Sequence, residues 1–242
     1  MKKIELYSRL NRLINIAGFD IRRFPARDQR SLLKYLGENN VNDCFDVGAN
    51  IGQYARLFRS SGFKGKIFSF EPQYNAFEKL KKQASQDSLW EVFNIGLGDT
   101  DGSYEINISK NSVSSSLLEM DDVLKNAAPD SAFIGTEVIK VNRIDTIIKD
   151  IVGEKRIFLK IDAQGFESKI LDGAEGCFNN IFALQLELAC VSLYKEEKLF
   201  NEMKAFIESK DFYLSSLESG FVDPDTGRLL QVEAIFLREK KK

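Results

Sequence analysis

The stretch over residues 44–54, with the sequence CFDVGANIGQY, constrains the fold of this chain more than any other. A short apolar run ends in an acid, the chain then breaks into glycines, and a helix-compatible segment follows. This order predicts a strand over 44–47, a tight loop, and a helix over 52–60. Glycines let a backbone approach a ligand closely, and the first N–H groups of the helix point to the same place. We therefore expect a ligand site at the carboxyl end of this strand.

Apolar strand-like runs alternate with amphipathic segments along the rest of the chain. Strands are expected at 66–70, 91–97, 156–161 and 181–188, and helices at 28–36, 75–85, 167–171 and 196–209. An edge strand is expected at 104–109 and a short strand at 138–141, with an irregular segment over 110–136. The last two strands, 212–217 and 232–237, have no helix between them and should pair as an antiparallel hairpin. The pattern predicts an α/β fold with a mostly parallel, Rossmann-like sheet, one antiparallel strand and helices on both faces.

The first 40 residues are expected to form an N-terminal helical segment ahead of one domain over 41–242. Apolar side chains at spacings of three and four predict an amphipathic helix over 4–17. Residues 1–30 hold eight Lys and Arg and three acids, a net charge of +5, which leaves -7 for the remainder of a chain of net charge -2. The apolar face could pack on the domain or on a second copy in a homodimer. Alternatively, residues 1–26 could make a peripheral contact with an acidic membrane surface.

The composition excludes several classes of function. The chain contains no histidine, which rules out Ser-His-Asp and Cys-His catalysis and any histidine-ligated metal site. The net charge of -2 gives no reason to expect a nucleic-acid partner. Three cysteines without a close pair are typical of buried free thiols in a reducing compartment, so we expect a cytoplasmic protein. No apolar run approaches about 18 residues, and the N-terminus is not typical of a secretory signal.

Acidic residues lie at or just beyond the carboxyl ends of the predicted strands, at the edge where ligands bind in open α/β sheets. They are Asp46, Glu71, Asp99, Asp162 and Glu187. Each could also be a helix cap or a solvated turn residue. Glu71 lies 23 residues beyond Gly48, and a carboxylate at the end of the second strand can accept hydrogen bonds from both hydroxyls of a ribose. This position predicts a nucleoside-containing cofactor.

The glycine loop helps to choose between cofactors. A dinucleotide fingerprint, G-x-G-x-x-G, requires glycines where this chain has Asn50 and Gln53. A cofactor without a pyrophosphate fits better, and S-adenosylmethionine carries a ribose, an amino-acid tail and a sulfonium cation. An NAD-dependent oxidoreductase is the alternative enzyme. A non-catalytic nucleoside-binding or membrane-associated protein is the alternative outside enzymology.

Several motifs together resemble those of the FkbM-type methyltransferases over about residues 40–240. They are DVGANIGQY at 46–54, FEP at 70–72, GLGD at 96–99, LKIDAQGFE at 159–167 and LE at 186–187. The block over 160–167, followed by LDGA at 171–174, is the part most specific to this family. Family members commonly have Val-Glu-Gly where this chain has Ala163, Gln164 and Gly165, so the loop lacks one carboxylate.

The resemblance implies a class I methyltransferase fold and methyl transfer from S-adenosylmethionine to a hydroxyl on a sugar, a polyketide or a related metabolite. The acceptor would be a small molecule or a glycan. The residues that would contact the methionine part are Asp46, Gly48, Ala49, Asn50, Gly52 and Tyr54. Glu71, with Pro72 beside it, would hold the ribose, and Leu97 would lie against the adenine. Asp162 would lie near the sulfonium and the acceptor.

Methyl transfer to a hydroxyl needs a group that takes the proton. Without histidine the candidates are a carboxylate, a lysine, a tyrosine or metal-bound water. We rank Asp162 first, Glu187 second and Glu167 third. Asp162 and Glu187 could instead hold a divalent cation, although we predict no metal ligands, and Asp162 could simply balance the sulfonium charge. Serines at 112 and 114–116, here called the serine segment (112–116), form either a solvated loop or a lid over the acceptor.

Overall fold

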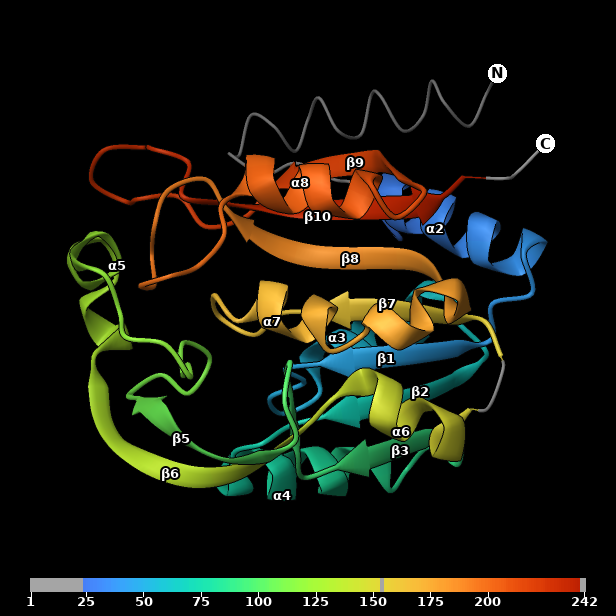
Figure 1. Cartoon of the computed structure of the whole chain (residues 1–242), viewed down its shortest axis with the longest axis horizontal. Helices are drawn as coiled ribbons and strands as arrows, with labels where there is room; N and C mark the ends of the chain where they lie inside the picture. Colours follow the sequence, from blue (N-terminus) through green and yellow to red (C-terminus); the bar gives the residue numbers. More distant parts are fainter. Residues whose placement is uncertain (1–23, 153–154, 240–242) are drawn as a thin grey trace, which may run out of the picture.

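The fold is described from a computed structural model, which describes residues 24–152 and 155–239. In this part of the chain seven strands form a central sheet (Figure 1). Their order is β3 (Trp90–Phe93), β2 (Lys66–Phe70), β1 (Asp43–Val47), β7 (Ile157–Ile161), β8 (Ile181–Ala189), β10 (Gln231–Arg238) and β9 (Phe212–Ser219). Neighbouring strands are parallel except that β10 runs antiparallel to both β8 and β9. The predicted α/β fold, with one antiparallel strand from a late hairpin, is therefore confirmed.

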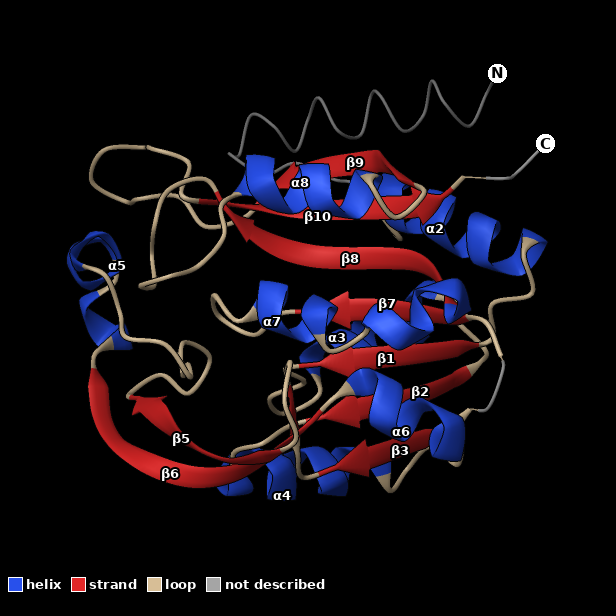
Figure 2. Ribbon diagram, viewed as in Figure 1, coloured by secondary structure: helices blue, strands red, loops and turns tan. Residues whose placement is uncertain are grey.

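Helices cover both faces of this sheet (Figure 2). One face packs against α2 (Arg27–Glu38), α3 (Gln53–Ser61) and α4 (Tyr74–Ala84). The other packs against α6 (Ile144–Ile151), α7 (Glu167–Asp172), the 3-10 helix η2 (Glu175–Asn180) and α8 (Phe200–Glu208). Alternate residues of each strand point into the two layers, as the pleat of a sheet requires. The sheet is thus buried on both sides, which accounts for its apolar strands.

The central strands β1 and β7 are buried along their whole length. They nevertheless carry charged side chains: β1 has Asp43 at its start and Asp46 near its end, and β7 has Lys160. Asp46 and Lys160 lie opposite each other in the parallel register. Buried charges are rare unless they are paired. Their position close to the carboxyl ends of the strands marks the region of the sheet where a site is expected.

A second, three-stranded sheet stands beyond the carboxyl ends of the parallel strands (Figure 1). Its order is β4 (Gly96–Leu97), β6 (Phe133–Asn142) and β5 (Gly102–Ser109). The sequence predicted an irregular segment over 110–136. This prediction is wrong in part, because the segment contains α5 (Asp122–Ala127), the 3-10 helix η1 (Pro129–Ser131) and the start of β6. The Asp121 carboxylate accepts a hydrogen bond from the N–H of Asp122 and so caps α5. The short strand predicted at 138–141 is the end of β6.

Two other predicted elements have different bounds. The strand expected at 91–97 is divided between β3 and β4, because the Asn94 amide donates to the backbone oxygens of Glu71 and Pro72 and turns the chain between the sheets. The helix expected at 196–209 begins only at Phe200. Its start is marked by a hydrogen bond from the N–H of Leu199 to the Glu202 carboxylate, 3.1 Å long.

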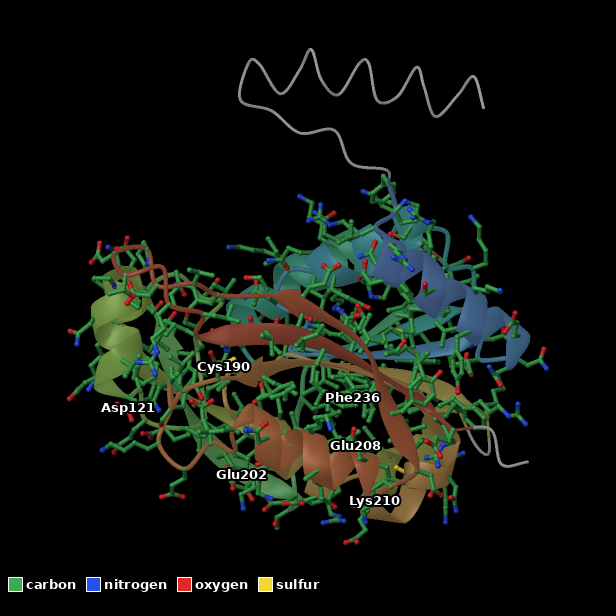
Figure 3. All side chains as sticks on the ribbon, turned by 90° about the horizontal axis from the view of Figure 1, so that it is seen from above. Asp121, Cys190, Glu202, Glu208, Lys210 and Phe236 are labelled. Atoms are coloured by element: carbon green, nitrogen blue, oxygen red, sulfur yellow. The ribbon has the colours of Figure 1, made fainter. Side chains whose placement is uncertain are left out.

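Helix α8 illustrates how a short helix closes the core beside the hairpin. Met203 and Ile207 are buried in the same cluster as Phe236 of β10. Glu202 and Glu208 lie on the exposed side (Figure 3). Helix α6, in contrast, has no counterpart among the sequence predictions, since its run of isoleucines does not stand out from the neighbouring strands.

The helix predicted at 4–17, and most of the segment 1–26 expected to contact membranes, lie outside the described residues. The helix predicted at 28–36 is α2, and its Leu32 and Leu36 are buried against the sheet. Among the helices within 24–152 and 155–239, none is long and apolar enough to span a bilayer.

Candidate active site

A cavity of about 330 Å³ lies at the carboxyl ends of β1, β2 and β7. Eight of the predicted site residues line it, namely Gly48, Ala49, Asn50, Tyr54, Glu71, Pro72, Leu97 and Asp162. These residues come from four separate segments of the chain, which follow β1, β2 and β7 or belong to β4, and the fold brings them together at one edge of the central sheet. The cavity therefore lies where the sequence predicts a ligand site.

Gly48 allows the loop after β1 to touch the loop after β7. Its φ is +72°, and a Cβ at this position would lie 1.8 Å from the backbone oxygen of Asp162. No side chain fits there, so the glycine is required for this close approach. The contact fixes the loop after β1 beside Asp162.

Glu71 is buried at the end of β2, with 3% of its surface exposed. Its Oε2 accepts a hydrogen bond from the N–H of Asn50 (2.8 Å), and its Oε1 accepts one from the N–H of Gln73 (2.9 Å). Burial raises the pKa of Glu71 to about 7, although both hydrogen bonds act to lower it. The carboxyl group therefore titrates near neutral pH.

Lys160 lies between two carboxylates. Its Nζ is 3.3 Å from Oδ1 of Asp46 and 3.6 Å from Oδ2 of Asp162, and it lies 5.2 Å from the centre of the Tyr54 ring. Burial by itself would lower the pKa of Lys160, but Asp46, Asp162 and Glu233 together raise it above its usual value. The neighbouring carboxylates thus favour the charged form of the ammonium group.

Asp46 does not line the cavity and is fully buried. Its Oδ2 accepts a hydrogen bond from the Ser69 hydroxyl (3.0 Å), which in turn accepts one from the Trp90 indole (2.9 Å). In the structure Asp46 contacts Lys160 and lies off the cavity wall. The sequence predicted instead that Asp46 contacts the methionine part of the cofactor.

Glu187 and Glu233 lie opposite each other on β8 and β10. The Gln231 side chain donates to Glu187 (3.1 Å), and the Gln185 side chain donates to Glu233 (3.2 Å). Burial, followed by the neighbouring Asp162 and Glu233, raises the pKa of Glu187 to about 9. Glu233 lines the cavity, whereas Glu187 stands behind it.

Two further predicted residues also lie off the cavity wall. Gly52 packs against Trp90, where a Cβ would be 2.7 Å from the ring. The Glu167 carboxylate accepts hydrogen bonds from the N–H groups of Ala163 (2.8 Å) and Gly165 (3.3 Å), and burial raises its pKa to about 7. Glu167 thus holds the loop after β7, and Asp162 is the one predicted base that faces the cavity.

The serine segment (112–116) covers the cavity and is largely buried. Ser112, Ser115 and Ser116 line the cavity, and the backbone oxygen of Ser112 accepts a hydrogen bond from the Asn50 side chain (3.2 Å). The hydroxyl of Ser116 donates to the backbone oxygen of Gln164 (2.6 Å). The segment is therefore bonded to the loops after both β1 and β7, and the solvated-loop interpretation does not hold.

Sequence reasoning gave no role to several residues at or beside the cavity, among them Lys160, Gln164, Tyr194 and Glu233. Lys160 carries a usable signal, because it is the one charged residue of the apolar strand β7. Glu233 carries a weaker one, because β10 also contains Gln231 and Arg238. Gln164 and Tyr194 carry none, since an amide or a phenol in a loop has many ordinary explanations.

The cavity has two chemically different parts. Its apolar lining residues include Leu97, Ile106, Ile139, Phe166 and Ile170. Its charged lining residues include Asp162, Lys160 and Glu233. Such a cavity can hold a flat ring system against the first part and present a carboxylate to a polar group at the second. Within 24–152 and 155–239 no group of three or more His, Cys, Asp or Glu is arranged to hold a metal ion.

Comparisons with known proteins place this geometry in context. The family described as "Methyltransferase FkbM domain" matches residues 46–214. A solved methyltransferase FkbM from Methylobacillus flagellatus is similar over 81% of this chain, with 17% identity and a TM-score of 0.50. This chain covers 44% of that protein, less than half of its length. At such an identity the likeness supports the fold alone.

Two other solved structures have lower scores. An rRNA methylase from Streptococcus thermophilus is similar over 90% of this chain and 100% of its own, with 11% identity and a TM-score of 0.47. A 1,6-didemethyltoxoflavin-N1-methyltransferase from Burkholderia thailandensis is similar over 88% of this chain and 78% of its own, with 9% identity and a TM-score of 0.45. We found no significant match among curated proteins.

Proposed function

This chain belongs to the FkbM methyltransferase family, and on that premise we propose that it transfers a methyl group from S-adenosylmethionine to a hydroxyl group of a small molecule or glycan. Family membership favours a methyltransferase over the NAD-dependent oxidoreductase and over the non-catalytic alternative. The donor, the acceptor atom and the acceptor class are our proposal.

One observation carries the proposal of a hydroxyl acceptor. Asp162 presents its carboxylate to the cavity that Glu71 and the loop after β1 also line. The Asp162 side chain is 36% exposed. The chain has no histidine that could act as base. A hydroxyl must lose its proton as it is methylated, and a positioned carboxylate can accept that proton.

The residues of the cavity fit S-adenosylmethionine. Each oxygen of Glu71 uses one lone pair for a backbone N–H and keeps another for a ribose hydroxyl. The apolar lining that includes Leu97 and Phe166 suits an adenine ring. Gln53 and Tyr54, at the start of α3, place a helix N-terminus beside the cavity, which favours a carboxylate such as that of the methionine part.

When bound, S-adenosylmethionine supplies a methyl group on a sulfonium sulfur, so that the S–C bond breaks, an O–C bond forms and neutral S-adenosylhomocysteine is left. The residues of this chain hold the reactants and move the proton. Asp162 accepts the hydroxyl proton, and the ammonium group of Lys160 lies 3.6 Å from Oδ2 of Asp162. The serine segment, bonded to both loops, excludes water from the reacting groups.

A methylation screen tests this proposal. The full chain is incubated with methyl-labelled S-adenosylmethionine and panels of sugars, lipids and polyketides, and calorimetry compares the binding of S-adenosylmethionine with that of NAD. We expect binding of the former and a labelled methyl ether. Asp162→Asn should lower turnover by about 100-fold or more while S-adenosylhomocysteine binds as in the wild type. Wild-type turnover in that variant, or a methyl group found on nitrogen, would count against the proposal.

A further inference from the structure

We propose that Gln164 is a positioning residue for Asp162. Its side-chain amide ties the carboxylates of Asp162 and Glu187 to Tyr194 and so sets the orientation in which Asp162 faces the cavity. The inference rests on the proposed function, because it takes Asp162 as the base.

A single amide nitrogen joins the two carboxylates. Nε2 of Gln164 donates to Oδ1 of Asp162 at 2.8 Å and to Oε2 of Glu187 at 3.1 Å. The NH₂ group of a glutamine has two hydrogens, one for each of these acceptors. The acids come from the ends of neighbouring strands, β7 and β8, so the amide bridges two strands that meet at the cavity.

The Asp162 carboxylate fixes which way the amide points, and the other end of the amide faces Tyr194. The Tyr194 hydroxyl lies 2.9 Å from Oε1 of Gln164 and 3.2 Å from the backbone oxygen of Ser114, and its side chain is fully buried. With the amide turned over, Oε1 would face the Asp162 carboxylate, which accepts hydrogen bonds but does not donate them. Only one orientation of Gln164 therefore satisfies all its neighbours.

The backbone of Gln164 is held as firmly as its side chain. Gln164 has a φ of +54°, and Gly165 follows with a φ of +93°. A Cβ on Gly165 would lie 2.9 Å from Cβ of Tyr194, so the loop packs directly on that residue. Glu167 holds the loop through two N–H groups, and Ser116 holds the backbone oxygen of Gln164. These contacts fix the backbone position from which the Gln164 side-chain amide reaches Asp162.

Both carboxylate oxygens of Asp162 therefore have a defined contact. Oδ1 faces the Gln164 amide, and Oδ2 lies 3.6 Å from Nζ of Lys160. These two contacts define the plane of the carboxylate, while each oxygen keeps a lone pair for a proton from the acceptor. A displacement of about 1 Å in a catalytic group can cost about 100-fold in rate, which is the scale of effect that such a constraint protects.

The test compares the full chain with Gln164→Glu, Gln164→Met and Gln231→Met, all saturated with S-adenosylhomocysteine. Carbon-13 NMR follows the titration of the Asp162 carboxyl signal, which a fourth variant, Asp162→Asn, assigns by its loss. The titratable groups that act on Asp162 are Lys160, Glu167, Glu187, Tyr194 and Glu233. Gln164→Glu places a further negative charge against Asp162, and we expect its titration to move up by about one pH unit. Gln164→Met, which removes only the hydrogen bond, should move it less in the same direction.

Gln231→Met is the matched control, because it removes an amide from Glu187 but none from Asp162. The Asp162 titration should stay at its wild-type position in that variant. With an acceptor from the screen, both Gln164 variants should lower kcat by about 10- to 100-fold without changing the KM for S-adenosylmethionine. An Asp162 titration that is the same in all chains, or that moves as far in Gln231→Met, would overturn the inference. A wild-type chain that neither binds nor uses S-adenosylmethionine would instead overturn the proposed function.

Discussion

Replacing Lys160 with methionine should destabilise the protein through Asp46. The change removes the ammonium group that lies 3.3 Å from Oδ1 of Asp46, while the bond from Ser69 to Oδ2 remains. Oδ1 has no hydrogen bond of regular geometry in the described part of the chain, so the charge of Lys160 is what compensates it. Asp46 is fully buried and cannot gain water in exchange.

The magnitude follows from this burial. Removing one partner of a buried ion pair typically costs about 3–5 kcal/mol, because the remaining charge is left uncompensated. For a chain of this size that corresponds to a fall in Tm of roughly 6–20 °C. Asp46→Asn combined with Lys160→Met removes both charges, and we expect it to recover at least about half of the loss.

Urea unfolding followed by circular dichroism measures these differences. Lys66→Met is the matched control. Lys66 of β2 pairs with Glu91 of β3 at the surface, and 45% of the Lys66 side chain is exposed. Its loss should cost about 1 kcal/mol or less. A cost below about 1 kcal/mol for Lys160→Met, or a double variant no more stable than the single one, would refute the reasoning.

Three other predictions concern the cavity and the N-terminus. Because burial raises the pKa of Glu71 to about 7 and ribose hydroxyls favour its ionised form, calorimetry should show S-adenosylhomocysteine binding about three- to tenfold more tightly at pH 8 than at pH 6. An affinity independent of pH would contradict this role. Gly48→Ala should cost about 3 kcal/mol or more in thermal unfolding, because its Cβ would meet a backbone oxygen, whereas Gly135→Ala meets nothing within 4 Å and should be tolerated. Equal stabilities would argue against the close approach of the two loops. Removing residues 1–26 should abolish sedimentation with anionic vesicles; unchanged sedimentation would exclude the predicted membrane contact.

The cavity itself was largely predictable. Glu71 and Asp162 each follow an apolar strand, and parallel strands bring their carboxyl ends to the same edge of a sheet. Local order along the chain is therefore enough to place these acids together. The glycine at position 48 was predictable for the same reason, because its place between strand and helix is a local property.

The roles of the acids were less predictable, since these depend on which way each side chain points. Asp46 and Asp162 both lie at strand ends, yet one is sealed behind the wall and the other faces the cavity. In the parallel register Asp46 lies inside the sheet opposite Lys160, whereas Asp162 comes two positions after Lys160, beyond the end of β7. Glu167 lies only five residues beyond Asp162, but its carboxylate is directed to backbone N–H groups of its own loop.

The sequence alone was enough to predict the alternating α/β architecture, the antiparallel hairpin, and the edge of the sheet at which the cavity lies. All three follow from hydrophobic periodicity and from the order of the elements, which are local in the chain. Only the tertiary structure decided that Lys160 joins Asp46 to Asp162, and that Gln164 joins Asp162 to Glu187 and Tyr194. These contacts join residues up to 114 positions apart in the chain, which strand register and loop packing bring together. The pattern within a single stretch of sequence cannot predict them.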